Sequence, residues 1–282
     1  MFARVPASSA NLGPGFDAIA VALELYVEVT ITPGDRFAIT SEGCGAGLFD
    51  HDDHLGAVVA AQVLGHRDFA IHIASDIPLS RGLGSSAALA LAAAAAAGAS
   101  DPLAVATRFD GHAENAAASM FGGLVVASVA DSGEVIARSL DLDDAWRFVV
   151  VVPDEELSTS TARDVLPEQV TFADAVSNLH ALGLLIAGLA NHGLFVGSSM
   201  DDRLHQPYRA PLLPYSTALL AALRAAGAAG SCWSGAGSSM LGLVTASSAS
   251  AVADAASSFL DDHGVAGSVL TLGADRSGLV TR

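Results

Sequence analysis

The segment from Phe69 to Gly98 constrains the fold of this chain most. FAIHI at residues 69–73 suits a strand, and a proline and a glycine-rich turn then lead into a run of alanine and leucine that ends at Gly98. Alanine has the highest helix propensity, and glycine is favoured just after a helix, so residues 85–97 are predicted to form a helix. This run is too short to span a membrane and is read as an internal helix.

The turn at residues 77–88, IPLSRGLGSSAA, has the features of an anion-binding loop. Gly82 and Gly84 permit positive φ and let the backbone approach a ligand closely. The first amides of the following helix lack intrahelical partners, so they and the helix dipole attract an anion. Ser85 and Ser86 add hydroxyls for phosphate oxygens or a magnesium ion. On these residues alone, the alternative is a plain Gly-Ser turn that caps a helix.

The charge of the chain restricts what it binds. The net charge is −17, all 13 cationic side chains are arginines, and there is no lysine. Such a chain repels nucleic acid and anionic membranes, and we expect neither as a partner. A Walker-type loop is excluded because it needs a lysine. A phosphate compound must therefore be held by backbone amides, a helix N-terminus, a metal ion or a single placed arginine.

The two cysteines, Cys44 and Cys232, lie far apart and have no metal-ligand spacing, which is typical of reduced thiols in a cytoplasmic protein. The N-terminal MFARVPASSANLG lacks the basic and apolar regions of a signal peptide. We therefore expect a cytoplasmic protein.

Strands and helices mix irregularly along the chain, which predicts an α+β fold with a domain boundary near residue 145. The segment at 5–17 is poor in helix formers and rich in turn residues, and is predicted to be a loop. A strand at 19–32 ends at Pro33-Gly34, and residues 37–41 are expected to return as its hairpin partner. Further predicted helices cover 55–65, 112–120, 171–192, 215–226 and 248–261, and further predicted strands cover 147–152 and 267–272.

The string P-L-S-R-G-L-G-S-S-A-A resembles the ATP-binding motif of the GHMP kinases, named after galactokinase, homoserine kinase, mevalonate kinase and phosphomevalonate kinase. The resemblance implies that ATP is bound by Pro78, Leu79, Ser80, Arg81, Gly82, Leu83, Gly84, Ser85, Ser86, Ala87 and Ala88.

The loop at residues 5–17 resembles the N-terminal motif of the homoserine kinases within this family. In that motif the asparagine and the aspartate, here Asn11 and Asp17, face the amino-acid substrate. Without the resemblance, both residues would be read as makers of Asx-type turns.

The segment D-G-H-A-E-N at 110–115, followed by Gly122-Gly123, resembles the family's E-G-H-P-D-N…G-G with three substitutions. The resemblance places Asp110 and Ser86 at the magnesium ion, and His112 and Asn115 at the homoserine end. Asp110, Glu114 and Asn115 are the candidate catalytic residues. Asn115 cannot act as a base, so we favour direct attack by an oriented hydroxyl, with Glu114 as the rival base.

Three further strings complete the resemblance. Residues 234–239, SGAGSS, resemble the family's G-S/A-G-P-S/T, with Ser238 in place of the proline. Residues 158–167 resemble the family's S-T-x-x-A-R-x-x-L-P, and residues 202–209 resemble its D-x-x-x-x-P-x-R. They imply that Thr159, Arg163 and Arg209 bind substrate. Homoserine is a zwitterion, so its carboxylate needs an arginine and its ammonium an acid such as Asp17.

The resemblance implies two domains, at 1–145 and 146–282. The first would resemble ribosomal protein S5 and contain a left-handed βαβ unit, and the second would be ferredoxin-like. The implied reaction is transfer of the ATP γ-phosphoryl group to the hydroxyl of L-homoserine, with ATP and Mg²⁺ as cofactors. Two alternatives stay open: a GHMP kinase for mevalonate, pantoate or shikimate, and a non-catalytic nucleotide-binding relative. The sequence does not fix the oligomeric state, and a homodimer is left open.

Overall fold

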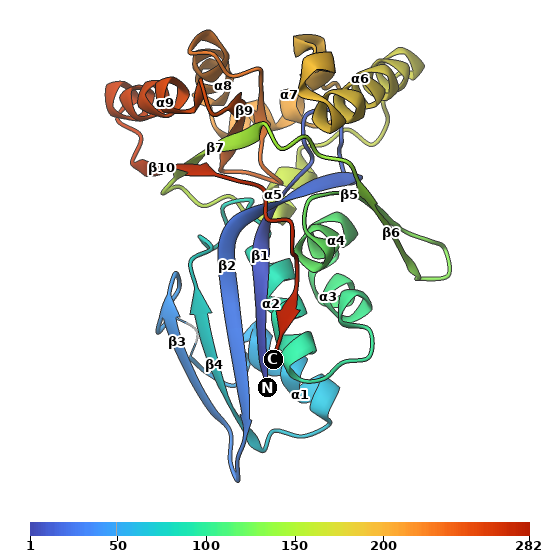
Figure 1. The fold of residues 1–282 in the computed structure, drawn as a ribbon, viewed down its shortest axis with the longest axis vertical. Coiled ribbons are helices and arrows are strands. Elements are labelled where there is room, and N and C mark those ends of the chain that lie inside the picture. Colours follow the sequence, from blue (N-terminus) through green and yellow to red (C-terminus); the bar gives the residue numbers. More distant parts are fainter. Residues whose placement is uncertain (49) are drawn as a thin grey trace.

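The computed structural model describes residues 1–48 and 50–282 and contains two sheets (Figure 1). The first sheet consists of β1 (Phe2–Ala10), β2 (Ile19–Pro33), β3 (Ala38–Gly43), β4 (Phe69–Ser75), β5 (Leu124–Val129), β6 (Val135–Leu140) and β11 (Val280–Thr281). The second sheet consists of β7 (Trp146–Pro153), β8 (Gly230–Trp233), β9 (Met240–Thr245) and β10 (Gly267–Leu272). The predicted α+β class is confirmed.

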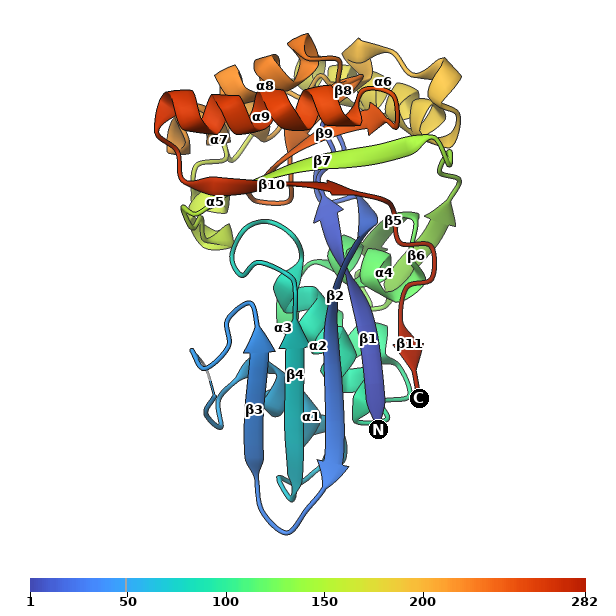
Figure 2. The ribbon, with the colours of Figure 1, turned by 60° about the vertical axis from the view of Figure 1, so that its left-hand side comes forward.

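Helices cover one face of each sheet. Those of the first half are α1 (Leu55–Leu64), α2 (Ser85–Ala96), α3 (Pro102–Asp110) and α4 (Ala113–Phe121). Those of the second half are α5 (Thr159–Asp164), α6 (Phe172–Ala190), α7 (Gln206–Arg209), α8 (Ser216–Ala225) and α9 (Ala249–His263). Figure 2 shows α1 and α2 behind the first sheet, and α6, α8 and α9 on the face of the second sheet that points away from the first half.

The predicted alanine-rich helix is α2, and it is the buried centre of the first half. Its alanines from Ala90 to Ala94 are fully buried, and the helix packs against α1, α3, β1 and β2. Small side chains let it lie close to all four elements at once. Its N-terminus is thereby held firmly at the end of the first half that faces the second sheet (Figure 1).

Residues 5–10, predicted to be part of a loop, are instead the second half of β1. Ser8 and Ser9 are fully buried, and β1 pairs with both β2 and β11. The register shifts between Pro6 and Ala7, which is where a proline is tolerated in a strand. Burial between neighbouring strands and α2 therefore overrides the weak strand propensity of these residues.

The expected hairpin between β2 and β3 is wrong. β4 lies between them, antiparallel to β2 and parallel to β3, so β3–α1–β4 is a parallel crossover. Phe69, Ile71 and Ile73 of β4 are buried, whereas β3 is largely exposed. The more apolar strand thus takes the central position and leaves the polar one at the edge.

The two halves of the chain are not fully separate. The chain changes sheet between β6 and β7, and β11 returns to pair with β1 in the first sheet. The division into domains at residue 145 stays a prediction, and we propose that residues 273–282 belong structurally with the first half.

Helix α6 is, among the described residues, the one helix that is apolar and long enough to cross a membrane, by length and composition alone. Five of its residues, including Asn178 and Leu185, are buried inside the protein. The expectation of no membrane partner stays a prediction.

Candidate active site

The glycine-rich turn presents the free end of α2. Gly84 is the N-cap residue with φ 64° and ψ 24°, and no side-chain bond caps the helix there. Ser80 and Gly82 also have left-handed backbone conformations. The first N–H groups of a 12-residue helix are therefore left for a ligand, and such an end attracts an anion.

Arg81 ties this loop to the second half of the molecule. Its Nε donates to the carbonyl of Pro153 at 2.8 Å, and its Nη2 donates to that of Asp154 at 2.5 Å. Its Nη1 donates to the carbonyl of Leu79 at 2.9 Å. With these donors engaged, Arg81 lines the site but chiefly holds the loop against the end of β7.

The loop at 234–239 packs directly on the glycine-rich turn at residues 77–88. Ser234 Oγ donates to the Gly82 carbonyl at 2.7 Å, and Gly235 N donates to the carbonyl of Ala10 at 2.9 Å. A Cβ on Gly82 would lie 2.1 Å from the Ser234 carbonyl oxygen, so this contact requires a glycine. Ser238, which replaces the family's proline, donates to the Glu155 carbonyl at 2.5 Å and so anchors the loop.

A cavity of about 150 Å³ lies where these segments meet. It is lined by residues from every motif of the sequence: Asn11, Ser80, Arg81, Gly82, Gly84, Ser85, Ser86, Asp110, His112, Glu114, Asn115, Thr159, Arg163, Arg209, Gly235 and Ala236. The chain therefore brings most of the predicted site residues together. Of the predicted ATP-binding residues, Pro78 and Leu79 do not line it, nor do the buried Leu83, Ala87 and Ala88. Asp17 lies in an adjoining hollow with Arg163 and Glu114.

Two acids and two polar partners form one side of the cavity. Asp110 ends α3, and its Oδ2 lies 3.1 Å from His112 Nδ1. This hydrogen bond raises the pKa of His112. Glu114 is only 3% exposed, and burial raises its pKa. Asn115 donates to Glu114 Oε1 at 3.1 Å and accepts from Ser8 Oγ at 2.8 Å, so it orients the carboxyl group of Glu114.

Arg163 and Asp17, which the sequence analysis assigns to the carboxylate and the ammonium group of a ligand, are paired with each other. The guanidinium donates to both carboxylate oxygens, at 2.9 and 3.0 Å. This hydrogen bond raises the pKa of Arg163. Asn11 Oδ1 accepts from the backbone N of Asp17 at 2.8 Å and so fixes the turn that carries the carboxylate.

Arg209 is the most buried cation of the site, with 1% exposure. Burial lowers its pKa to about 10. Its Nε donates to the carbonyl of Ala162 at 3.0 Å, and its Nη1 donates to the carbonyl of Gly235 at 3.1 Å. Arg209 thus links the segment of α5 to the loop at 234–239 while it lines the cavity.

A second, more apolar cavity of about 360 Å³ adjoins the first and shares Ser80, Ser85 and Ser86 with it. Leu55, Ile73, Leu79 and Leu89 are among its walls, and His54 lines it while its Nδ1 caps α1 by accepting from Gly56 N. Among these four apolar wall residues, the sequence motifs pointed to Leu79 alone, because an apolar wall assembled from separate elements has no local pattern.

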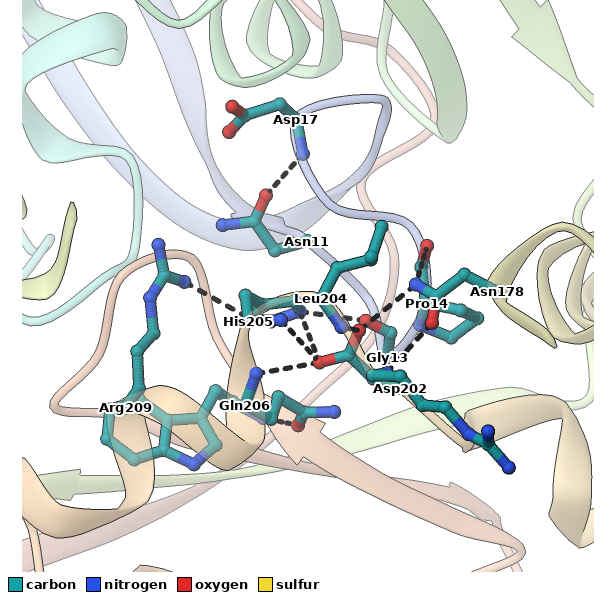
Figure 3. Close-up of polar contacts among 12 residues, drawn as sticks. Asn11, Gly13, Pro14, Asp17, Asn178, Asp202, Leu204, His205, Gln206 and Arg209 are labelled. Carbon is teal, nitrogen blue, oxygen red and sulfur yellow. Dashed lines mark hydrogen bonds and ion pairs between the residues drawn. The ribbon is translucent and has the colours of Figure 1, made fainter. Parts of the chain in front are cut away.

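The sequence analysis also missed a buried network behind the cavity (Figure 3). Asp202 accepts from the backbone N of Leu204, His205 and Gln206, and from the side chain of Asn178. His205 lies 3.1 Å from Arg209 Nη1. Asp202 and His205 stand inside the string that led to Arg209, so their spacing from that arginine was the available signal.

Comparison with known proteins identifies two matching family profiles. The profile for the GHMP kinases N terminal domain matches residues 54–123, and that for the GHMP kinases C terminal matches residues 173–262. Curated homoserine kinases are similar over most of the chain. The one from Nostoc sp. is 36% identical, over 98% of this chain and 96% of its own, and the one from Natranaerobius thermophilus is 36% identical, over 79% of each.

Solved structures give the same picture. The homoserine kinase from Cytophaga hutchinsonii is 26% identical with a TM-score of 0.86, covering 99% of this chain and 96% of its own. A mevalonate kinase from L. major, 15% identical, has a TM-score of 0.71 over 98% of this chain and 96% of its own, and shows likeness of fold alone.

Proposed function

Because this chain belongs to the homoserine kinases of the GHMP kinase family, we infer that it transfers the γ-phosphoryl group of ATP to the side-chain hydroxyl of L-homoserine. It is a small-molecule kinase, and its product, O-phospho-L-homoserine, is a precursor of threonine. One cavity carries this proposal, because it joins the glycine-rich turn at residues 77–88, the phosphate loop, to Asn11, His112, Thr159, Arg163 and Arg209.

ATP is proposed to lie across both cavities. The free N-terminus of α2 would bind its phosphates through backbone N–H groups, a device that needs no lysine. The adjoining apolar cavity, with Leu55, Leu79 and Leu89, suits the purine ring. The serines shared by the two cavities stand where the two parts of the nucleotide would join.

The residues present fit a magnesium ion carried with ATP. Magnesium keeps several waters and needs only one or two carboxylates besides substrate phosphates. Among the described residues, no group of three or more His, Cys, Asp or Glu side chains forms a complete metal cage. Asp110 and Ser86 both line the cavity of about 150 Å³ and would hold the ion there. The ion would neutralise charge on the phosphoryl group during its transfer.

The residues around the cavity suit a zwitterionic alcohol. Arg163 and Arg209 would bind its carboxylate, and Asp17 its ammonium group. The substrate hydroxyl then attacks directly, with its proton passing to phosphate or to water. Glu114, buried and with a raised pKa, is the rival acceptor of that proton.

ADP release measured with homoserine, mevalonate, pantoate and shikimate tests the proposed function. Homoserine is expected to be turned over far better than the others. Preference for a substrate without an ammonium group would favour another GHMP kinase activity. If none of the four compounds caused ADP release although ATP binding was measurable, the protein would be a non-catalytic relative. The substitutions at residues 110, 113, 114 and 238 motivate this test.

Replacing either carboxylate-binding arginine by alanine is expected to raise the KM for homoserine while leaving that for ATP nearly unchanged. A hydrogen bond to a charged group contributes about 1.5–3 kcal/mol, which corresponds to at least a tenfold rise in the KM for homoserine. Arg209→Ala should have the larger effect, because it also strands the buried carbonyls of Ala162 and Gly235. Arg138→Ala is the control, since Arg138 is exposed and bonds to its own neighbour. A rise confined to the KM for ATP would contradict the assignment.

The pairing of Asp17 with Arg163 predicts how the site treats 4-hydroxybutyrate, which has the carboxylate of homoserine but no ammonium group. Homoserine supplies a new partner to each charge, whereas 4-hydroxybutyrate would take Arg163 and leave the carboxylate of Asp17 unpaired. We expect the wild-type protein to bind 4-hydroxybutyrate at least tenfold more weakly than homoserine. Asp17→Asn should weaken homoserine binding but tighten that of 4-hydroxybutyrate, because Arg163 is then free.

Calorimetric titration of both ligands measures this reversal. The control is Asp144→Asn, which removes an exposed ion pair with Arg276 at 2.8 Å. That variant should bind both ligands as the wild type does. If Asp17→Asn weakened both ligands equally, the two charges would not be exchanging partners.

A further inference from the structure

His205 is a fully buried histidine directly before α7, and its ring is bonded on both sides (Figure 3). Nε2 lies 2.8 Å from the carbonyl oxygen of Gly13. A carbonyl can only accept, so Nε2 carries the proton. In the neutral ring Nδ1 is then an acceptor, and Arg209 Nη1 donates to it at 3.1 Å. The ring therefore joins the loop after β1 to the buried arginine.

His205 Nδ1 completes the set of acceptors around Arg209. The carbonyls of Ala162 and Gly235 take the Nε proton and one Nη1 proton, and His205 Nδ1 takes the other Nη1 proton. These three acceptors come from three different segments and leave the guanidinium a single orientation. The N–H groups that remain are those available in the cavity that Arg209 lines.

The bond holds only while the imidazole is neutral, because an imidazolium would direct an N–H at the guanidinium. Burial lowers the pKa of His205, which keeps the ring neutral near pH 7. The charged groups that face it are Asp202, whose Oδ2 lies 3.4 Å from Nε2, and Arg209. Asp17 also acts on the ring through its negative charge. The ring of Phe16 stacks on the imidazole, with ring centres 5.1 Å apart.

We propose that His205 is a positioning residue that orients Arg209 for the carboxylate of the substrate and ties it to the loop bearing Asn11 and Asp17. This inference rests on the proposed function, since it concerns recognition of the same amino acid. Asp202 supports it by accepting from three successive backbone N–H groups, which fixes the turn that carries the imidazole. Removing His205 should therefore disturb homoserine recognition more than ATP binding.

Three variants separate the two bonds of the ring. His205→Asn keeps an acceptor near Nδ1 but cannot reach Gly13, His205→Gln keeps a donor near Nε2, and His205→Leu keeps neither. We expect His205→Leu to raise the KM for homoserine at least tenfold, with a smaller change in kcat and none in the KM for ATP. His205→Asn should stay within about threefold of the wild type, and His205→Gln should lie between the two.

The pH profile gives a readout that a merely structural role would not move. In the wild type, the KM for homoserine should rise as the pH falls through the lowered pKa of His205, below the ordinary value of 6.5. His205→Asn should lose that limb. Equal impairment of His205→Asn and His205→Leu, or an unchanged KM for homoserine in His205→Leu, would overturn the proposal. So would parallel rises in both KM values that follow a fall in the melting temperature.

A failure of the proposed function looks different. It would appear as absence of homoserine-dependent ADP release in the wild-type protein itself. In that case nitrogen-15 NMR of the histidine rings still tests the geometry. A neutral ring protonated on Nε2 at pH 7 is expected for His205, and the other tautomer would contradict its bond to Arg209.

Discussion

Gly84→Ala is expected to weaken ATP binding at least a hundredfold, about 2.7 kcal/mol. Gly84 has φ +64°, and an added Cβ would lie 2.1 Å from Ser8 Oγ and 3.0 Å from Asn115 Oδ1. These two atoms are hydrogen-bonded to each other at 2.8 Å, so the methyl group would be forced between them. The start of α2 must then shift, and the N–H groups that would bind phosphate shift with it.

Two further variants separate this displacement from backbone strain. Gly98, just beyond the other end of α2, also has positive φ, but a Cβ there would meet nothing within 4 Å. Gly98→Ala therefore carries similar strain and should bind ATP normally. In the double variant Ser8→Ala with Gly84→Ala, the colliding hydroxyl is gone and Ser8 Cβ is 3.4 Å away, so part of the affinity should return. Ser8→Ala alone gives the baseline.

Nucleotide titration and a melting curve on each variant measure the effect. Unimpaired ATP affinity in folded Gly84→Ala would refute the phosphate-loop assignment. A loss of affinity that is equal in Gly98→Ala would attribute the effect to strain in the helix instead.

The fold was predictable from sequence wherever a segment's local pattern and its tertiary environment agree. The alanine run forms α2 because both propensity and burial favour a helix of small side chains. Residues 5–10 show the opposite case, because PASSA has little strand propensity and becomes part of β1 only through its neighbours β2, β11 and α2. The partner of β3 was missed for a similar reason, since β4 is more than 20 residues farther along the chain and more apolar.

The site was predictable as a set of residues, and less so as a set of contacts. Each motif pointed to its own residues, and the cavity unites most of them. The bidentate pair of Asp17 and Arg163 joins residues 146 positions apart, so no local sequence pattern could predict it. The burial of Arg209 and its bond to His205 likewise depend on three segments meeting. What the sequence leaves open is therefore which charged side chains pair with one another.

Asp110→Asn is expected to lower the catalytic rate at least tenfold, about 1.4 kcal/mol of barrier, and to weaken the apparent affinity for magnesium. Asparagine keeps the shape of the side chain and can still bond to His112, whose Nδ1 lies 3.1 Å from Asp110 Oδ2. The variant thus removes the charge with little change in packing. Asp110→Glu keeps the negative charge and introduces the longer side chain of the family's motif, so its effect on the rate should be much milder.

Glu114→Gln is the matched comparison for the magnesium ligand. Glu114 lines the same cavity, but burial raises its pKa, and a carboxyl group that resists ionisation is the poorer ligand for a cation. We expect Glu114→Gln to leave the dependence of rate on magnesium concentration unchanged. Its amide oxygen can still accept from Asn115, and no charge has to be buried, so the protein should remain folded.

Magnesium titrations of the rate in both variants distinguish the two acids. If Glu114→Gln shifted the magnesium dependence and Asp110→Asn did not, the ion would be held by Glu114. If Glu114→Gln instead lost rate at saturating magnesium together with one limb of the pH profile, Glu114 would be the group that accepts the proton of the substrate hydroxyl. Direct attack without a protein base requires that Glu114→Gln keep most of the rate. The two acids, one at the end of α3 and the other at the start of α4, would then have different roles. Asp110 would hold the ion, and Glu114 would shape the cavity.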